Sequence, residues 1–221
     1  MVPSTTVQVM GTAGRSAAGV CRGLAAKTVR SARYPGAIRD KDELLLAMID
    51  ALHAETLAEL PDPTGDWAAD LAAIAHHTHA AFLRHPSVAA HAYRTARREH
   101  EFRIVERIIG CMRRAGFDDP QAARLYRVFA DFILGYSAVD AGLAALEPAI
   151  RDADLLSWEI QYRTLPQGQY LNTAAVAHAL PALNDPGNFT TAVDLMIEAI
   201  RARAATARDP GTSPGSRRGD A

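Results

Sequence analysis

Apolar residues recur at every third or fourth position along most of the chain, which is the spacing of one face of an α-helix. This pattern predicts helices over residues 40–60, 66–85, 87–96, 99–115, 119–146 and 188–205, with shorter helical pieces around Trp158 and Ala175. No stretch alternates apolar and polar residues as a half-buried strand does. The sequence therefore predicts an all-α fold.

Several predicted helices begin at residues that favour helix N-termini. Asp40 and Asn188 are expected to cap the first and the last helix. Asp118 or Asp119 is expected to cap the longest helix, because Pro120 follows in its first turn.

Large aromatic side chains fall on the apolar faces of these helices, and we expect them to point into the protein. They are Trp67, Phe82, Tyr93, Phe102, Phe129, Phe132 and Tyr136.

The helix over 119–146 carries a second stripe, made of the small residues Gly135, Ala138 and Gly142. A glycine inside a helix costs about 1 kcal/mol relative to alanine, and close approach of another helix would offset that cost. Both this helix and the one over 188–205 are apolar over more than one stripe, whereas one stripe is enough to join a core. We therefore expect a homodimer interface that also includes Val193 and Ile197.

The composition is that of an ordinary globular protein. Apolar residues make up 48% of the 221 residues and charged residues 22%, which excludes a collagen, a wholly disordered chain and a disulfide scaffold. No apolar run reaches the roughly 18–20 residues of a membrane span, and the start of the chain lacks the apolar stretch of a signal peptide. With only two cysteines, Cys21 and Cys111, far apart, we expect free thiols in a cytoplasmic protein.

Charge is distributed unevenly. Residues 1–39 contain six Lys or Arg residues and no acidic residue, so the remainder carries −7 within a total of −1. A basic end on an acidic body favours a polyanionic partner, and an unstructured basic leader is the alternative interpretation.

Catalytic and metal-binding motifs are missing from the sequence. There is no glycine-rich phosphate loop, no nucleophile elbow and no cysteine with a plausible histidine partner. His76, His77 and His79 share one predicted helix but lack the i, i+4 spacing of a zinc pair, so we expect one of them to line an interior cavity and the others to face solvent. The charged run over 97–103 is expected to be a solvated face. We expect no enzyme, no cofactor and no metal.

Four segments resemble parts of the TetR family of transcriptional regulators. Ile38 to Leu46 (I-R-D-K-D-E-L-L-L) resembles the join between the DNA-binding head and the fourth helix of that family. Phe82 to Pro86 is similar to the end of its fifth helix, Phe132 to Tyr136 to the middle of its eighth, and Phe189 to Ile200 to its closing dimerisation helix. The likeness covers roughly residues 39–205.

The resemblance implies a helix-turn-helix head over 1–39 and a ligand-binding and dimerisation body over 40–206. The last residues are rich in Asp, Pro, Gly, Ser and Arg, a composition that predicts a disordered tail over 207–221. It also implies a ligand-responsive repressor that binds operator DNA as a homodimer and is released by a small effector of unknown identity. Residues that would contribute groups to the effector cavity, with core packing as the alternative for each, are His77, Thr78, Tyr93, Arg97, Phe129 and Tyr136.

The head departs from the family pattern. Arg33 to Ala37 replaces an aromatic-rich turn, Pro35 would break the end of a recognition helix, and residues 1–37 contain one Leu, no Ile and no Phe. Two hypotheses remain: a divergent head that binds DNA, or a helical ligand-binding dimer that has lost specific DNA binding. For a working head, the residues that would contact DNA are Lys27, Thr28, Arg30, Ser31, Arg33 and Tyr34.

Overall fold

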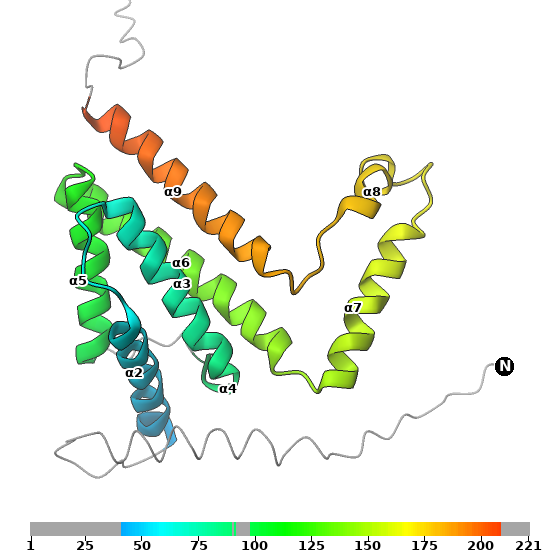
Figure 1. The fold of residues 1–221 in the computed structure, drawn as a ribbon, viewed down its shortest axis with the longest axis horizontal. Helices are drawn as coiled ribbons and strands as arrows, with labels where there is room; N and C mark the ends of the chain where they lie inside the picture. Colours follow the sequence, from blue (N-terminus) through cyan, green and yellow to red (C-terminus); the bar gives the residue numbers. More distant parts are fainter. Residues whose placement is uncertain (1–40, 90, 92–97, 209–221) are drawn as a thin grey trace, which may run out of the picture.

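The computed structural model describes residues 41–89, 91 and 98–208, and every regular element within them is helical (Figure 1). This confirms the predicted all-α fold. In chain order the elements are α2 (Lys41–Glu59), α3 (Trp67–Arg84), α4 (Pro86–Ala89), α5 (Glu99–Arg114), α6 (Asp119–Ala144), α7 (Pro148–Arg163), α8 (Leu171–Val176), the 3-10 turn η1 (Ala177–Ala179) and α9 (Pro186–Arg208).

Two predicted helices differ from the observed ones. The short piece expected around Trp158 is a 16-residue helix, α7, which begins at Pro148 and has no glycine or further proline inside it. The helix expected over 87–96 is observed only as α4, and its remainder lies outside the described residues except for His91, which is in a turn.

Of the predicted N-terminal caps, Asp118 is confirmed. Its carboxylate accepts a hydrogen bond from the backbone of Gln121, whose side chain accepts one in return from the Asp118 backbone, and Pro120 occupies the first turn. Asn188 does not cap α9, because that helix begins at Pro186 and the Asn188 amide instead donates to a backbone oxygen in the preceding loop. Asp40 lies outside the described residues.

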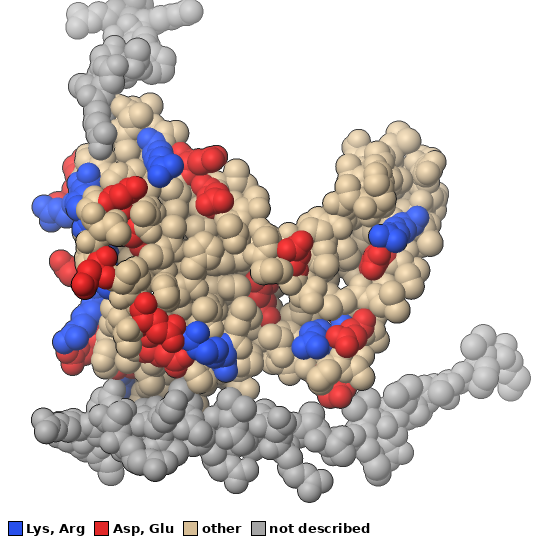
Figure 2. All heavy atoms as spheres, in the orientation of Figure 1, with Lys and Arg blue, Asp and Glu red and all other residues tan. Residues whose placement is uncertain are grey.

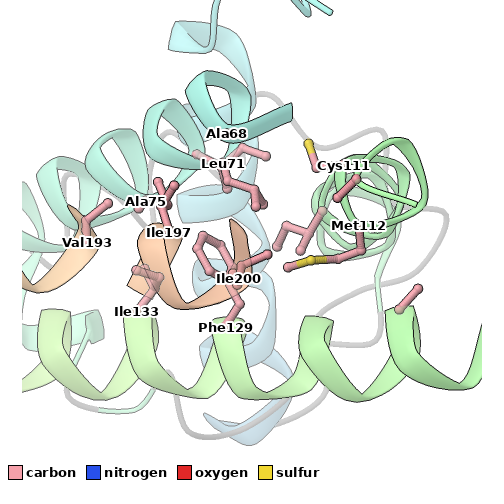
Figure 3. Close-up of a cluster of buried hydrophobic side chains, with 14 of the residues drawn as sticks. Ala68, Leu71, Ala75, Cys111, Met112, Phe129, Ile133, Val193, Ile197 and Ile200 are labelled. Atoms are coloured by element: carbon pink, nitrogen blue, oxygen red, sulfur yellow. The ribbon is translucent and has the colours of Figure 1, made fainter. Parts of the chain in front are cut away.

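Helix α3 lies at the centre of the body, in contact with α2, α5, α6 and α9. Its inward face meets those of α5, α6 and α9 in the main hydrophobic core (Figure 3). Full burial of a large apolar side chain stabilises a fold by about 1.5–3 kcal/mol, so this core orients the four helices. The residues labelled in that view are Ala68, Leu71, Ala75, Cys111, Met112, Phe129, Ile133, Val193, Ile197 and Ile200.

A second, smaller core fixes the position of α2. There, Ile49 and Leu52 pack with Phe82 from α3, Val88 from α4 and Ala141 from α6. Helix α2 is therefore held against the body along its apolar face, including the half nearer to residues 1–40.

The first turn of α5 does not follow the sequence expectation. Phe102 was expected to point inward, yet its side chain is 59% exposed. The inward face of α5 is formed instead by Ile104, Ile108, Cys111 and Met112, one helical stripe that excludes position 102.

Residues 148–183, which we call the arm, project away from the body (Figures 1 and 2). Helix α7 leaves α6 at 113°, and neither α7 nor α8 contains a buried residue. Within the described residues, the main packing contacts of α7, α8 and η1 are with one another. No single helix in the described part of the chain is long and apolar enough to cross a membrane, and α6 and α7 meet that criterion only as this bent pair.

Candidate ligand cavity

A cavity lies between α2, α3, α5 and α6. Its volume is about 70 Å³, and apolar side chains form most of its wall. Polar side chains enter it from all four helices, and no Lys or Arg occurs among the described lining residues. The lining residues are His53, Ile74, Thr78, Glu101, Ile104, Val105, Ile108, Tyr126, Phe129, Ala130, Ile133 and Leu134.

His53, from α2, is a buried polar group in the cavity wall. Its side chain is only 8% exposed, and its Nδ1 atom is buried with no hydrogen-bond partner among the described residues. Burial lowers the pKa of His53 below its ordinary value of 6.5, although the charges of Glu101 and Asp50 act in the opposite direction. The imidazole is therefore neutral at pH 7.

Asp50, which is buried, pairs with the partly exposed His100 one helical turn from His53. His100 Nδ1 lies 2.8 Å from Asp50 Oδ2, and the His100 backbone N–H donates to Asp50 Oδ1 over 3.2 Å. Because His100 is in the first turn of α5, Asp50 places a negative charge at the N-terminus of that helix, where it is stabilising. This contact fixes the start of α5 against α2.

Glu101 brings a carboxylate to the same cavity. Its charge adds to burial, the main cause, in raising the pKa of the Tyr126 phenol above 10.0. Tyr126 therefore keeps its proton at neutral pH, and its hydroxyl can both donate and accept a hydrogen bond. Thr78, almost fully buried, contributes a second hydroxyl.

The structure brings two of the predicted effector-contacting residues into the cavity wall, Thr78 and Phe129. His77 is outside it and lies 3.8 Å from Glu59, measured between Nδ1 and Oε2. Tyr136 is also outside it and packs against Phe189, with ring centres 5.3 Å apart. Tyr93 and Arg97 lie outside the described residues.

None of the three clustered histidines lines this cavity, so the expectation that one would do so is wrong. His79 instead stacks on Phe189 with ring centres 3.9 Å apart and donates to Asp140, 2.8 Å from Nε2 to Oδ2. His76 meets the edge of the same phenylalanine ring. The cluster thus joins α3 to α6 and α9.

In the described part of the chain, no group of three or more His, Cys, Asp or Glu side chains could hold a metal ion.

Sequence reasoning missed three polar lining residues, His53, Glu101 and Tyr126. His53 follows Ile49 by four positions on the apolar face of α2, a spacing that predicts an inward histidine. Glu101 belongs to the charged run that was interpreted as a solvated face, yet it is only partly exposed. Because Glu101 lies within a charged segment, the sequence pattern did not indicate that its side chain faces the cavity.

The predicted interface residues divide into two groups. Val193 and Ile197 are buried in the protomer's own core (Figure 3), and their role in a dimer stays a prediction. Gly135 and Gly142 are exposed, with no atom within 4 Å of where a Cβ would lie, and Ala138 is partly exposed.

The predicted DNA-contacting residues, from Lys27 to Tyr34, all lie outside the described residues. The head and its two alternative interpretations therefore remain predictions.

We expect His53 to make stability depend on pH. Well above pH 6.5, His53 is neutral in both the folded and the unfolded protein. Below pH 6.5, the imidazole of His53 binds a proton more readily in the unfolded protein than in the folded one. The free energy of unfolding should therefore fall toward acid by up to about 1.4 kcal/mol per pH unit from this residue. Urea unfolding at pH 7.5 and 5.5 and fixed protein concentration should show a smaller loss in His53→Gln. Equal losses in the two proteins would contradict the assignment.

One protein-family model matches most of the chain. Its description is "Tetracyclin repressor-like, C-terminal domain", and it matches residues 60–204. These residues include the cavity helices α3, α5 and α6 and the whole arm. No curated protein matches the chain.

Solved structures with the same fold come from Streptomyces coelicolor. The TetR family protein ActR in complex with actinorhodin has a TM-score of 0.67 and 19% sequence identity, over 89% of this chain and 99% of its own. ActR in complex with (S)-DNPA gives 0.64 and 19%, over 89% and 100% of the two chains. The TetR regulator SCO7222 gives 0.62 and 26%, over 82% and 89%. The likeness to ActR lies in the fold.

Proposed function

Since the chain belongs to the TetR family of transcriptional regulators, we propose that it is a repressor that binds operator DNA as a homodimer and is released by a small effector. Regulators of this family are transcription factors and not enzymes. The observation that carries the proposal is the cavity, in whose wall Nδ1 of His53 is buried without a partner among the described residues, because an apolar space with a few polar groups suits a small molecule. The complexes of ActR with actinorhodin and (S)-DNPA support this use of the fold.

Helix α2 is the element through which an effector would act on the DNA-binding head. It begins at Lys41, directly after the predicted head, and carries His53 into the cavity wall. These residues are twelve positions apart, which is about 18 Å along a helix. A ligand that fits one position of α2 better than another shifts the population toward that position. We expect the effector to favour a position in which the two heads no longer match the spacing of the operator half-sites.

The homodimer would form along an exposed apolar stripe on α6. Its residues follow one another by alternating steps of four and three positions, which is the repeat of a helix–helix seam. Val139 is 71% exposed and Val128 49%, so the protomer leaves this stripe largely uncovered. The stripe consists of Val128, Phe132, Gly135, Val139 and Gly142 on α6, followed by Leu146 just after the end of the helix.

The arm offers further apolar surface to the same partner. Ile150, Leu156 and Ile160 on α7 are each more than half exposed. The open notch between arm and body, visible in Figure 2, is bordered by α7 and α9. A second protomer seated there would cover both the α6 stripe and the arm, which is the closed two-fold arrangement expected of a dimer.

DNA binding can be tested without knowing the operator. Repeated selection from a random duplex pool should enrich one two-fold symmetric sequence, bound at least about 1,000-fold more tightly than an unselected duplex at physiological salt. Fluorescence anisotropy at several salt concentrations separates this specific affinity from the steep salt dependence of phosphate contacts. Enrichment of no sequence, with equal salt-dependent affinity for all duplexes, would contradict the repressor function.

That contradicting result is the one expected of the alternative function, a helical ligand-binding dimer without specific DNA binding. The scarcity of apolar residues in 1–37 and the position of Pro35 favour this alternative. Hydrogen exchange distinguishes the two on the free protein. Protected amides in three segments before Arg39 indicate a folded head, whereas protection that begins only near Leu44 indicates the alternative.

A further inference from the structure

Helix α7 has two apolar faces on opposite sides. One face is partly covered by the rest of the arm, where Leu155 and Trp158 border a hollow shared with residues 177–183. The other face is displaced by two positions, which is about 200° around a helix. Every residue of this second face is exposed, Leu156 by 57% and Ile160 by 52%. We call it the α7 seam, and it consists of Ala149, Ala153, Leu156 and Ile160.

The arm lacks a core of its own. Neither α7 nor α8 contains a buried residue, so little apolar surface is removed from water to offset the conformational entropy that ordering the arm costs. A helix of 16 residues, the length of α7, is marginal in water without tertiary packing. A further surface that covers the α7 seam would supply the missing packing.

A groove of about 300 Å³ lies at the other end of α6 from the arm, between the first turns of α6 and the last turns of α9. On α6 it is bordered by Gln121, Arg124 and Leu125, which precede Val128 by seven, four and three positions. These residues therefore lie on the same side of the helix as the α6 stripe. The surface that a second protomer would cover thus runs from the groove along α6 to the base of the arm.

Two-fold symmetry offers two arrangements of a second copy on this surface. An axis parallel to α6 would place the two arms side by side, whereas an axis perpendicular to α6 runs the two α6 helices in opposite directions. The perpendicular axis brings the arm of each protomer to the groove of its partner, because arm and groove lie at opposite ends of the same stripe.

The distribution of charge favours the perpendicular axis. Residues 147–163 contain four acidic and two basic residues, so two arms side by side would set like charges against each other. The groove presents two arginines, Arg124 and Arg203, whose side chains are exposed. An acidic arm against two guanidinium groups is electrostatically complementary. The acidic residues are Glu147, Asp152, Asp154 and Glu159, and the basic ones are Arg151 and Arg163.

We infer that the two protomers of the dimer exchange arms. The α7 seam of each protomer packs against the partner's groove, and this contact keeps the arm folded. The inference rests on the proposed function, since it names the surfaces through which the proposed homodimer forms. Dimerisation and folding of the arm are then a single process.

Crosslinking between two different variants of the full chain tests the exchange. Leu156→Cys places a thiol on the α7 seam and Gln121→Cys places one in the groove, both in a Cys21→Ser background that keeps the buried Cys111. After the two variants are mixed and re-equilibrated, a short bismaleimide should join one chain of each kind. The yield should exceed that of either variant alone at least about tenfold, because neighbouring thiols in a dimer have millimolar effective concentrations. Leu83→Cys in place of Gln121→Cys is the matched control and should give only the background yield.

Hydrogen exchange tests whether the partner keeps the arm folded. Val139→Glu places a charge in the α6 stripe and is expected to separate the protomers. The amides of α7 should exchange at least about a hundredfold faster in this variant than in the unmodified dimer, whereas those of α3 should keep their protection. Leu156→Glu should weaken the dimer at least about tenfold. The matched control is Leu171→Glu, at a 72% exposed position of α8 off the seam, and it should leave the dimer unchanged.

Other results overturn the exchange and leave the proposed dimer in place. Crosslinking of Leu156→Cys with itself would show that the arms lie side by side. A mixture that forms dimers without joining the two cysteines would place the arm elsewhere, and α7 amides equally protected in a monomer would show an arm that folds alone. An unmodified protein that is monomeric in ultracentrifugation at micromolar concentration would overturn both the exchange and the proposed homodimer.

Discussion

Replacing Phe129 with alanine is expected to lower the free energy of unfolding by about 3–5 kcal/mol. The ring is 1% exposed and belongs to the core in which α3, α5, α6 and α9 meet. Its removal leaves a cavity beside one that already exists, so the surrounding side chains have little means of closing it. Urea unfolding at a fixed protein concentration measures the loss, because the stability of a dimer depends on concentration.

The control for this variant is Arg127→Ala, two positions away on the exposed side of α6. Among the described residues, Arg127 pairs with Asp131 at i, i+4 in solvent, an interaction worth no more than about 0.5 kcal/mol. A loss below about 1 kcal/mol for Phe129→Ala would contradict the core assignment.

Replacing Val139 with glutamate is expected to weaken the homodimer at least about a hundredfold. Burial of a valine side chain contributes about 1.5–3 kcal/mol, and the two-fold axis makes each substitution act twice. The glutamate additionally places two negative charges in the same seam. Analytical ultracentrifugation over a range of concentrations should show the unmodified protein as a dimer and this variant as a monomer at micromolar concentration.

The matched control is Leu83→Glu, the same type of change at an exposed apolar position near the end of α3, off the α6 stripe. It should leave the dimer unchanged. A dimer of undiminished affinity in Val139→Glu would show that the interface lies elsewhere, for example on the arm alone.

The helices of the body could be predicted because their boundaries depend on neighbouring residues. The cap of α6 needs only Asp118, Pro120 and Gln121, and the apolar spacing of α3 and α5 needs only the turns of each helix. The sequence pattern underestimated the length of α7, because that pattern depends on a regular inward face. Its apolar residues stay exposed in the protomer, so they form no clear inward face.

The cavity could be predicted only in part. Thr78 and Phe129 fall on apolar faces and were identified. His53, Glu101 and Tyr126 were not, because they come from three helices and only the packing of those helices brings them together. The orientation of Glu101 depends on how Asp50 holds the first turn of α5, a contact across fifty positions of sequence.

By itself, the sequence determined the all-α class, the family resemblance and the presence of surplus apolar surface on α6, all of which follow from residue type and helical period. The tertiary structure decided which face of each helix is covered. Val193 and Ile197 have the same periodicity as interface residues, yet α3 and α6 bury them within the protomer, while Val139 is left outside. A helical period repeats identically for a core and for an interface, so only the positions of the neighbouring helices distinguish the two.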